Sequence, residues 1–128
     1  MTTDRMLIGE LSKCAGVTPR TVRYYESLGL LSGEREGNGF HFYSPEALAR
    51  LDKIAILKRL GLDLGEIRSV INLYFTDPRG VEGKRAVLTI LEHHLAETQQ
   101  KIGDLARFQA ELEGNIAHMR RVVEDAER

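Results

Sequence analysis

Residues 8–43 decide the fold, and they read IGELSKCAGVTPRTVRYYESLGLLSGEREGNGFHFY. Apolar residues recur at helical spacing from Ile8 to Ala15, and Gly16 tolerates the left-handed conformation in which helices often end. Thr18 is a good N-cap, and Pro19 suits the first position of a helix, where no amide hydrogen is needed. The stretch therefore predicts two short helices joined by a tight turn, the arrangement of a helix-turn-helix.

A short hairpin should follow the second helix, which we expect to run to about Leu28 and to stop at Gly29. Residues 36–39 read Glu-Gly-Asn-Gly, and Asn-Gly is the strongest short-range signal for a hairpin turn. The flanking strands are expected at about 32–35 and 40–43. Two helices followed by a hairpin make a winged helix-turn-helix, a device that grips duplex DNA.

A pair of helices is expected behind the hairpin. Residues 44–46, Ser-Pro-Glu, combine an N-cap, a proline at the first helical position and an acid near the positive end of the helix dipole. Gly61 should end that helix. Asp63 and Glu66 have the spacing of a capping box, so a further helix should begin there and include Tyr74.

After a break at residues 76–80, one helix without proline is expected from about Val81 to Val123. Its eleven seam positions alternate by three and four residues from Leu88 to Val123, and all but Thr98 and Gln109 are apolar. The flanks are polar and charged. A stripe of this length cannot be buried against residues 1–75 alone, so a second copy of the chain is the economical partner. The apolar seam positions are Leu88, Leu91, Leu95, Ile102, Leu105, Leu112, Ile116, Met119 and Val123.

The composition excludes several classes of protein. The 128 residues carry a net charge of −1, but residues 1–60 hold nine Lys or Arg against seven Asp or Glu, and DNA binding depends on the local face. One cysteine, Cys14, excludes an intrachain disulfide and a cysteine-based metal cluster. No apolar run approaches the ~18 residues of a membrane span, and the start of the chain has no signal-peptide pattern, so we expect a cytoplasmic protein.

The second helix presents a basic face. Arg20, Arg23, Tyr24 and Ser27 share that face, and Val22, Tyr25 and Glu26 lie roughly opposite. Guanidinium groups donate bidentate hydrogen bonds to phosphate or to guanine, and the hydroxyls of Thr18 and Thr21 can reach phosphates beside the helix start. The alternative is a solvated charged face; the preceding turn and the following hairpin favour DNA.

The hairpin has its own candidates, because Arg35, Asn38 and His41 surround a glycine-rich tip that allows close approach to the DNA backbone. An ordinary hairpin with polar decoration is the alternative.

The chain carries the motifs IGEL at 8–11, GVT at 16–18, TVRYYE at 21–26 and GLL at 29–31, followed by Arg35, Asn38-Gly39-Phe40 and Tyr43-Ser44. Together these motifs resemble the DNA-binding domain of the MerR family of bacterial transcription regulators. Residues 48–73, including LGLDLGEI at 60–67, are similar to the helix pair behind the wing of that family.

The resemblance implies a homodimer joined by an antiparallel coiled coil, with one winged helix-turn-helix on each half of a pseudo-palindromic promoter operator. It also implies distortion of an overlong spacer between the −35 and −10 elements, so that RNA polymerase can engage both. The expected domains are 1–75 for DNA binding, 76–83 as linker, 84–124 as dimerisation helix and 125–128 as tail. The implied DNA contacts are Thr18, Arg20, Thr21, Arg23, Tyr24 and Tyr25 from the second helix, Arg35, Asn38, Gly39, Phe40 and His41 from the wing, and Lys58 from the third helix.

Two departures from the family pattern qualify these expectations. The wing pattern Gly-Tyr-Arg-x-Tyr is GFHFY here, at residues 39–43, so binding should be weaker, less dependent on salt and sensitive to pH through His41. Metal- and redox-sensing relatives place cysteines near the end of the dimerisation helix, and this chain has none there. We therefore expect no cofactor and no metal at His93, His94 or His118. Cys14 is expected to be an ordinary small residue of the first helix, with a redox sensor as the alternative, and the effector stays open.

The expected function is sequence-specific regulation of transcription without catalysis. No nucleophile–base pair, paired carboxylate motif or phosphate-binding glycine loop indicates an enzyme. An architectural or excisionase-like winged-helix protein is the alternative, and so is an interaction adaptor that uses the coil but has lost DNA binding. A footprint separates regulation, with one symmetric site, from architecture, with extended coverage.

Overall fold

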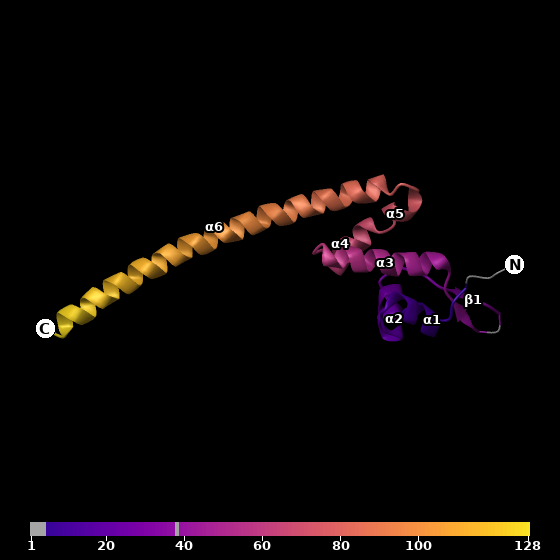
Figure 1. The fold of residues 1–128 in the computed structure, drawn as a ribbon, viewed down its shortest axis with the longest axis horizontal. Coiled ribbons are helices and arrows are strands. Elements are labelled where there is room, and N and C mark those ends of the chain that lie inside the picture. Colours follow the sequence, from indigo (N-terminus) through magenta and orange to yellow (C-terminus); the bar gives the residue numbers. More distant parts are fainter. Residues whose placement is uncertain (1–4, 38) are drawn as a thin grey trace. The chain divides into compact units, whose positions relative to one another are not determined.

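The computed structural model describes residues 5–37 and 39–128, and it divides into two compact units, Met1–Val87 and Leu88–Arg128. The helix that starts in the first unit makes up the second. The elements, in chain order, are α1 (Ile8–Ala15), α2 (Pro19–Ser27), β1 (Glu34–Arg35), β2 (His41–Phe42), α3 (Pro45–Arg59), α4 (Leu64–Val70), α5 (Leu73–Thr76) and α6 (Val81–Ala126) (Figure 1). A mainly α fold with a winged helix-turn-helix and a long C-terminal helix is thereby confirmed.

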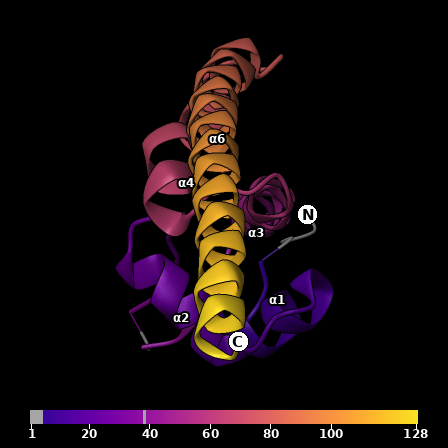
Figure 2. The same ribbon diagram turned by 90° about the vertical axis from the view of Figure 1, so that its left-hand side faces the viewer.

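The turn between α1 and α2 forms as the sequence predicts. Gly16 has a φ of 71°, which is the left-handed conformation that ends α1. The Oγ1 atom of Thr18 accepts a hydrogen bond from the amide of Thr21 at 3.1 Å, so Thr18 caps α2. Helix α1 lies against both α2 and α3 (Figures 1 and 2), and Leu11 and Val22 are fully buried there.

The wing is smaller than expected. Strands β1 and β2 are antiparallel, with Arg35 opposite His41, and they are shorter than the ranges 32–35 and 40–43. Tyr43 instead pairs with Met6 through two backbone hydrogen bonds of 2.9 and 2.8 Å. The chain before α1 therefore extends the wing, a long-range pairing that no local pattern announces.

Helix α4 begins as predicted and ends early. The amide of Glu66 donates to Oδ1 of Asp63 at 2.8 Å and the amide of Asp63 donates to Oε1 of Glu66 at 3.0 Å, which completes the capping box. The prediction that this helix includes Tyr74 is wrong, because α4 stops at Val70 and a turn separates it from α5. The turn places the side chain of Asn72 against α3.

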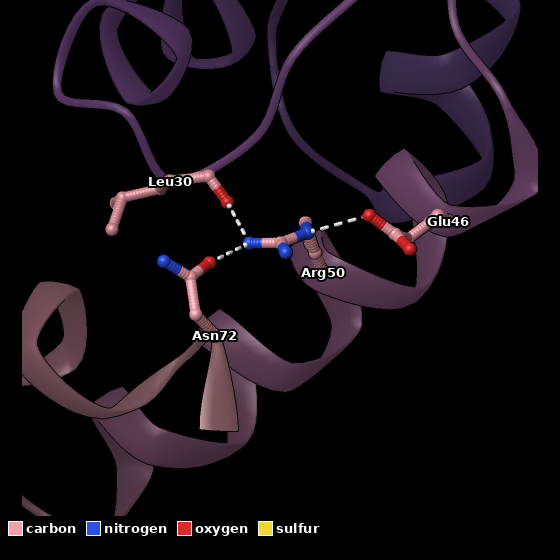
Figure 3. Close-up of polar contacts among 4 residues, drawn as sticks. All are labelled: Leu30, Glu46, Arg50 and Asn72. Atoms are coloured by element: carbon pink, nitrogen blue, oxygen red, sulfur yellow. Dashed lines mark hydrogen bonds and ion pairs between the residues drawn. The ribbon is translucent and has the colours of Figure 1, made fainter. Parts of the chain in front are cut away.

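Arg50 ties three segments together (Figure 3). Its Nη1 donates to the carbonyl of Leu30 at 3.1 Å and to Oδ1 of Asn72 at 2.8 Å, and its Nε donates to Glu46 at 3.1 Å. The guanidinium also lies 4.7 Å above the ring of Phe75. One side chain thus joins the end of the helix-turn-helix, helix α3 and the α4–α5 turn.

The two units differ in burial. The first has a core of large apolar side chains, and the most deeply buried of these are Tyr43, Leu11, Leu30, Ile54, Leu57, Ile67, Ile71 and Val22. No residue from 88 to 128 is buried, although the structure describes all of them. In the described part of the chain, none of the helices combines the length and the apolar character needed to cross a membrane.

Candidate DNA-binding surface

The side chains expected to read DNA gather on one face of α2. Arg20, Arg23 and Thr18 are exposed, and Thr21 is half-buried beside its cap partner. Tyr24 is also exposed on this helix. The face therefore offers two guanidinium groups and several hydroxyls to a phosphate backbone or to base edges.

Tyr25 stands apart from this face because its side chain belongs to the core. It is only 6% exposed, as its place on the helical wheel opposite the arginines predicts. Its hydroxyl accepts a hydrogen bond from Nζ of Lys58 at 3.3 Å. The ring of Tyr25 is therefore buried, and its hydroxyl supports the exposed side chain of Lys58. The hydroxyl is thus the part of Tyr25 that we expect to contact DNA.

The wing offers a second set of groups. Arg35 is exposed on β1, and Phe40, at 55% exposed, lies beyond a turn in which Gly39 has a φ of 88°. Asn38, which the sequence motif also assigns to this set, lies outside the described residues. The chain before α1 adds Arg5, which makes an ion pair with Glu36 and lies over the ring of Phe42 at 5.5 Å. Sequence reasoning missed Arg5, because no pattern near it connects it to the wing.

An open hollow of about 380 Å³ lies between α2 and the wing. Two arginines of opposite elements line it, Arg23 from α2 and Arg35 from β1, together with one carboxylate, Glu26. The full lining is Ile8, Arg23, Glu26, Ser27, Arg35, His41 and Tyr43. Two guanidinium groups at the rim suit a phosphate of the DNA backbone.

The floor of the hollow is a hydrogen bond between the wing and α2. The hydroxyl of Tyr43 donates to Oε1 of Glu26 at 2.6 Å. Burial, followed by the hydrogen bond to Glu26 and its negative charge, raises the pKa of Tyr43 to about 12, against the opposing charges of Arg23 and Arg35. The hydroxyl therefore keeps its proton at any physiological pH and remains a donor to Glu26.

The ring of His41 lines this hollow and faces Tyr43 and Glu26, and the direct DNA contact that the resemblance implies for His41 stays a prediction. Its ring stacks on Tyr43 with centroids 4.8 Å apart, and its Nε2 lies 3.3 Å from Oε2 of Glu26. Neither Glu26 nor Tyr43 was among the expected site residues. The helical wheel placed Glu26 roughly opposite the basic face of α2, and no local pattern connected it to the wing.

The residues that the structure describes contain no group of three or more His, Cys, Asp or Glu side chains that could hold a metal ion. Cys14 is exposed in α1, with a free thiol. The geometry is that of a cationic surface for a polyanion.

Comparison with known proteins places this surface in context. Residues 6–73 match the family model described as MerR HTH family regulatory protein, and residues 48–114 match the model described as MerR, DNA binding. The chain is 34% identical over 108 residues to the HTH-type transcriptional regulator ZntR homolog of Haemophilus influenzae, which covers 84% of this chain and 78% of that relative. It is 33% identical over 108 residues to the HTH-type transcriptional regulator HmrR of Rhizobium leguminosarum, which covers 84% and 81%.

A solved structure agrees with these relatives. The transcription regulator PbrR691 from Ralstonia metallidurans CH34, in complex with lead(II), matches with a TM-score of 0.65 and 34% identity. The match covers 84% of this chain and 82% of PbrR691. Fold and sequence therefore point to the same group of proteins.

Proposed function

This chain belongs to the MerR family of transcription regulators, and we propose that it acts as a homodimer on a pseudo-palindromic promoter operator. Its relatives are named as transcription regulators, so the chain is a DNA-binding regulator and not an enzyme. In the proposal each protomer sets α2 and its wing on one half of the operator. Bending and untwisting of an overlong spacer then lets RNA polymerase engage both promoter elements.

The observation that supports the homodimer is the exposed apolar seam of α6. Leu91 is half-buried, and the other seam residues are between 44% and 66% exposed. Single exposed apolar residues are ordinary on a protein surface. Apolar residues at nine of eleven positions spaced three or four apart, over most of a 46-residue helix, are not. An antiparallel copy of residues 84–124 would cover it, and the seam consists of Leu88, Leu91, Leu95, Ile102, Leu105, Leu112, Ile116, Met119 and Val123.

The cationic surface supports the DNA contacts. We assign backbone contacts to Arg23 and Arg35 at the rim of the hollow, and base or phosphate contacts to Arg20 at the start of α2. The remaining proposed contacts are Thr18, Thr21, Tyr24, Gly39, Phe40, Lys58 and the hydroxyl of Tyr25. Asn38 stays in the proposal on its sequence motif alone.

A metal ion is one class of effector to compare with the solved relative. PbrR691 is a lead(II) complex, whereas the described residues of this chain contain no group of three or more His, Cys, Asp or Glu side chains that could hold a metal ion. Cys14 is the chain's single cysteine.

The test is a footprint on DNA selected by the full-length protein from a random duplex library. One symmetric protected site supports regulation from a paired operator, and extended coverage without symmetry would favour the architectural alternative.

Arg20→Ala or Arg23→Ala should lower operator affinity about tenfold. Each should also reduce the slope of log affinity against log salt by about 0.9 for each phosphate that the variant no longer neutralises. The matched control is Arg121→Ala, an exposed arginine of α6 outside the surface. Equal reductions in the control and the two variants would remove α2 from the interface.

A further inference from the structure

Three side chains join the wing to α2 at the floor of the hollow. Glu26 comes from α2, His41 from β2, and Tyr43 follows that strand directly. One carboxylate oxygen of Glu26 accepts the Tyr43 hydroxyl at 2.6 Å, and the other lies 3.3 Å from Nε2 of His41. The carboxylate thus faces two wing residues at once.

The Nε2 atom of His41 is incompletely satisfied. It is buried and makes no hydrogen bond with any residue in the described part of the chain, because the approach to Glu26 lacks hydrogen-bond geometry. A buried polar atom without a partner is costly, and such atoms usually have a reason. The ring is held in this position by Tyr43 on one side and by Gly33, where an added Cβ would lie 2.1 Å from Nε2.

We propose that His41 is a proton-operated positioning residue that fastens the wing to α2. With a proton on both ring nitrogens, His41 faces the carboxylate of Glu26 as an imidazolium, and the contact becomes a charge-assisted ion pair. The neutral ring carries no charge, so its contact with Glu26 then lacks the ion pair, while the hydrogen bond from the Tyr43 hydroxyl to Glu26 remains. This inference rests on the proposed DNA binding by α2 and the wing, and it names a regulation of that site.

The surrounding charges decide the direction of the effect. The carboxylate of Glu26 lies 3.3 Å from Nε2 of His41, and Arg23 from α2 and Arg35 from β1 line the same hollow. A DNA phosphate bound beside these arginines adds negative charge next to the imidazolium and so stabilises the charged ring. Binding of DNA and binding of the proton are then linked, so each strengthens the other. DNA affinity should therefore rise as the pH falls.

The experiment measures affinity of the full-length protein for the library-selected duplex by fluorescence anisotropy, at constant ionic strength, from about pH 8.5 to about pH 5.5. Wild-type affinity should rise about tenfold between pH 8 and pH 6. His41→Arg, with a permanent charge, and His41→Gln, with none, should both lack this dependence. The His41→Gln profile also subtracts any contribution from the other histidines. A wild-type profile no steeper than that of His41→Gln overturns the inference.

Glu26→Gln separates fastening from direct contact with DNA. The amide oxygen can still accept the Tyr43 hydroxyl, but the carboxylate charge is gone, so the pH dependence should become weaker than in the wild type. A Glu26→Gln protein that keeps the wild-type dependence would show that His41 meets the phosphate itself, against the inference.

A readout without DNA keeps the two proposals distinct. Amide NMR signals of β1 and β2 should shift with pH over the same range in the wild type, shift less in Glu26→Gln, which keeps the imidazole of His41, and stay constant in His41→Gln. If these shifts occur while no variant binds the duplex at any pH, the proposed function fails and the fastening stands. If the duplex binds but the wing signals do not respond to pH, only the fastening fails.

Discussion

The two compact units treat their side chains in opposite ways. In Met1–Val87 the large apolar residues are buried, and polar groups make contacts between distant segments, such as Arg50 with Leu30 and Tyr43 with Glu26. In Leu88–Arg128 no residue is buried, and the polar contacts stay within one helix at spacings of three or four residues. The first unit therefore has a core of its own, whereas residues 88–128 bury no side chain within one chain, which supports the proposed pairing of two copies.

Each unit can therefore be followed by its own measurement. All four tyrosines lie between residues 24 and 74, so tyrosine fluorescence reports on the first unit alone. Sedimentation at fixed protein concentration reports on the pairing proposed for the second, because the stability of a dimer depends on concentration.

The largest effect is expected from a charge placed on the seam. Leu105→Glu should convert the dimer to a monomer, because a carboxylate cannot be buried unpaired between two apolar stripes. A monomer holds only one half-site, so operator affinity should fall about 100-fold or more. Sedimentation velocity and anisotropy measure both changes. Ala110→Glu, an exposed position off the seam, is the control, and equal behaviour of the two variants would end the coiled-coil proposal.

Loss of the Arg50 network should weaken the first unit and leave pairing intact. Arg50→Met keeps the length of the side chain but leaves the Leu30 carbonyl and the Asn72 amide oxygen without their donor, at a cost of about 2 kcal/mol in unfolding free energy. Arg50→Lys should recover only part of this, because an ammonium cannot reproduce the planar fork. Urea unfolding followed by tyrosine fluorescence is the measurement. Arg59 is exposed at the end of α3, so Arg59→Met should change the unfolding free energy little. An equal loss of unfolding free energy in Arg59→Met and Arg50→Met would show that the hydrogen bonds of Arg50 do not stabilise the first unit.

Tyr43→Phe should change how the first unit responds to alkali. The pKa of Tyr43 is raised from its ordinary value of 10.0 to about 12, so the hydroxyl stabilises the fold fully below about pH 10 and loses this contribution as the pH rises through about 12. Removing the hydroxyl should cost about 1 kcal/mol at neutral pH and flatten the decline of unfolding free energy above pH 10. Unfolding followed by circular dichroism tests this, with the exposed hydroxyl of Tyr24 removed by Tyr24→Phe as control. An equally steep alkaline decline in Tyr43→Phe would contradict it.

The smallest expected change in stability distinguishes the N-terminal caps of α4 and α3. Asp63→Ala should lower the unfolding free energy by about 1 kcal/mol, because it removes the acceptor of the α4 capping box. Ser44 occupies the cap position of α3 but makes no side-chain cap hydrogen bond, so Ser44→Ala should change stability by less than about 0.5 kcal/mol. Urea unfolding measures both, and a larger loss at Ser44 would reverse the ranking.

Local patterns predicted the elements well because each depends on residues within one turn of each other. The left-handed end at Gly16, the cap at Thr18 and the box of Asp63 and Glu66 all form as their spacing indicates. The prediction of one helix reaching Tyr74 was wrong. The break in this helix lies beside Asn72, whose side chain accepts a hydrogen bond from Arg50, 22 residues earlier in the chain. Propensity alone could not reveal that partner.

The candidate surface shows the same division. The wheel of α2 placed Arg20 and Arg23 outward and Tyr25 inward, and burial agrees with it. The wing offered no such guide, because which way His41 turns depends on Glu26 of another element and on the space left by Gly33.

The sequence by itself determined the period of each helix, its caps, the basic face of α2 and the apolar seam of α6, since these follow from residues spaced three or four apart. Only the tertiary structure decided which distant side chains meet: Arg50 with Leu30 and Asn72, and the wing with Glu26. Such contacts form because folding closes loops of many residues around one core. The spacing of residues along the chain carries no record of where those loops close.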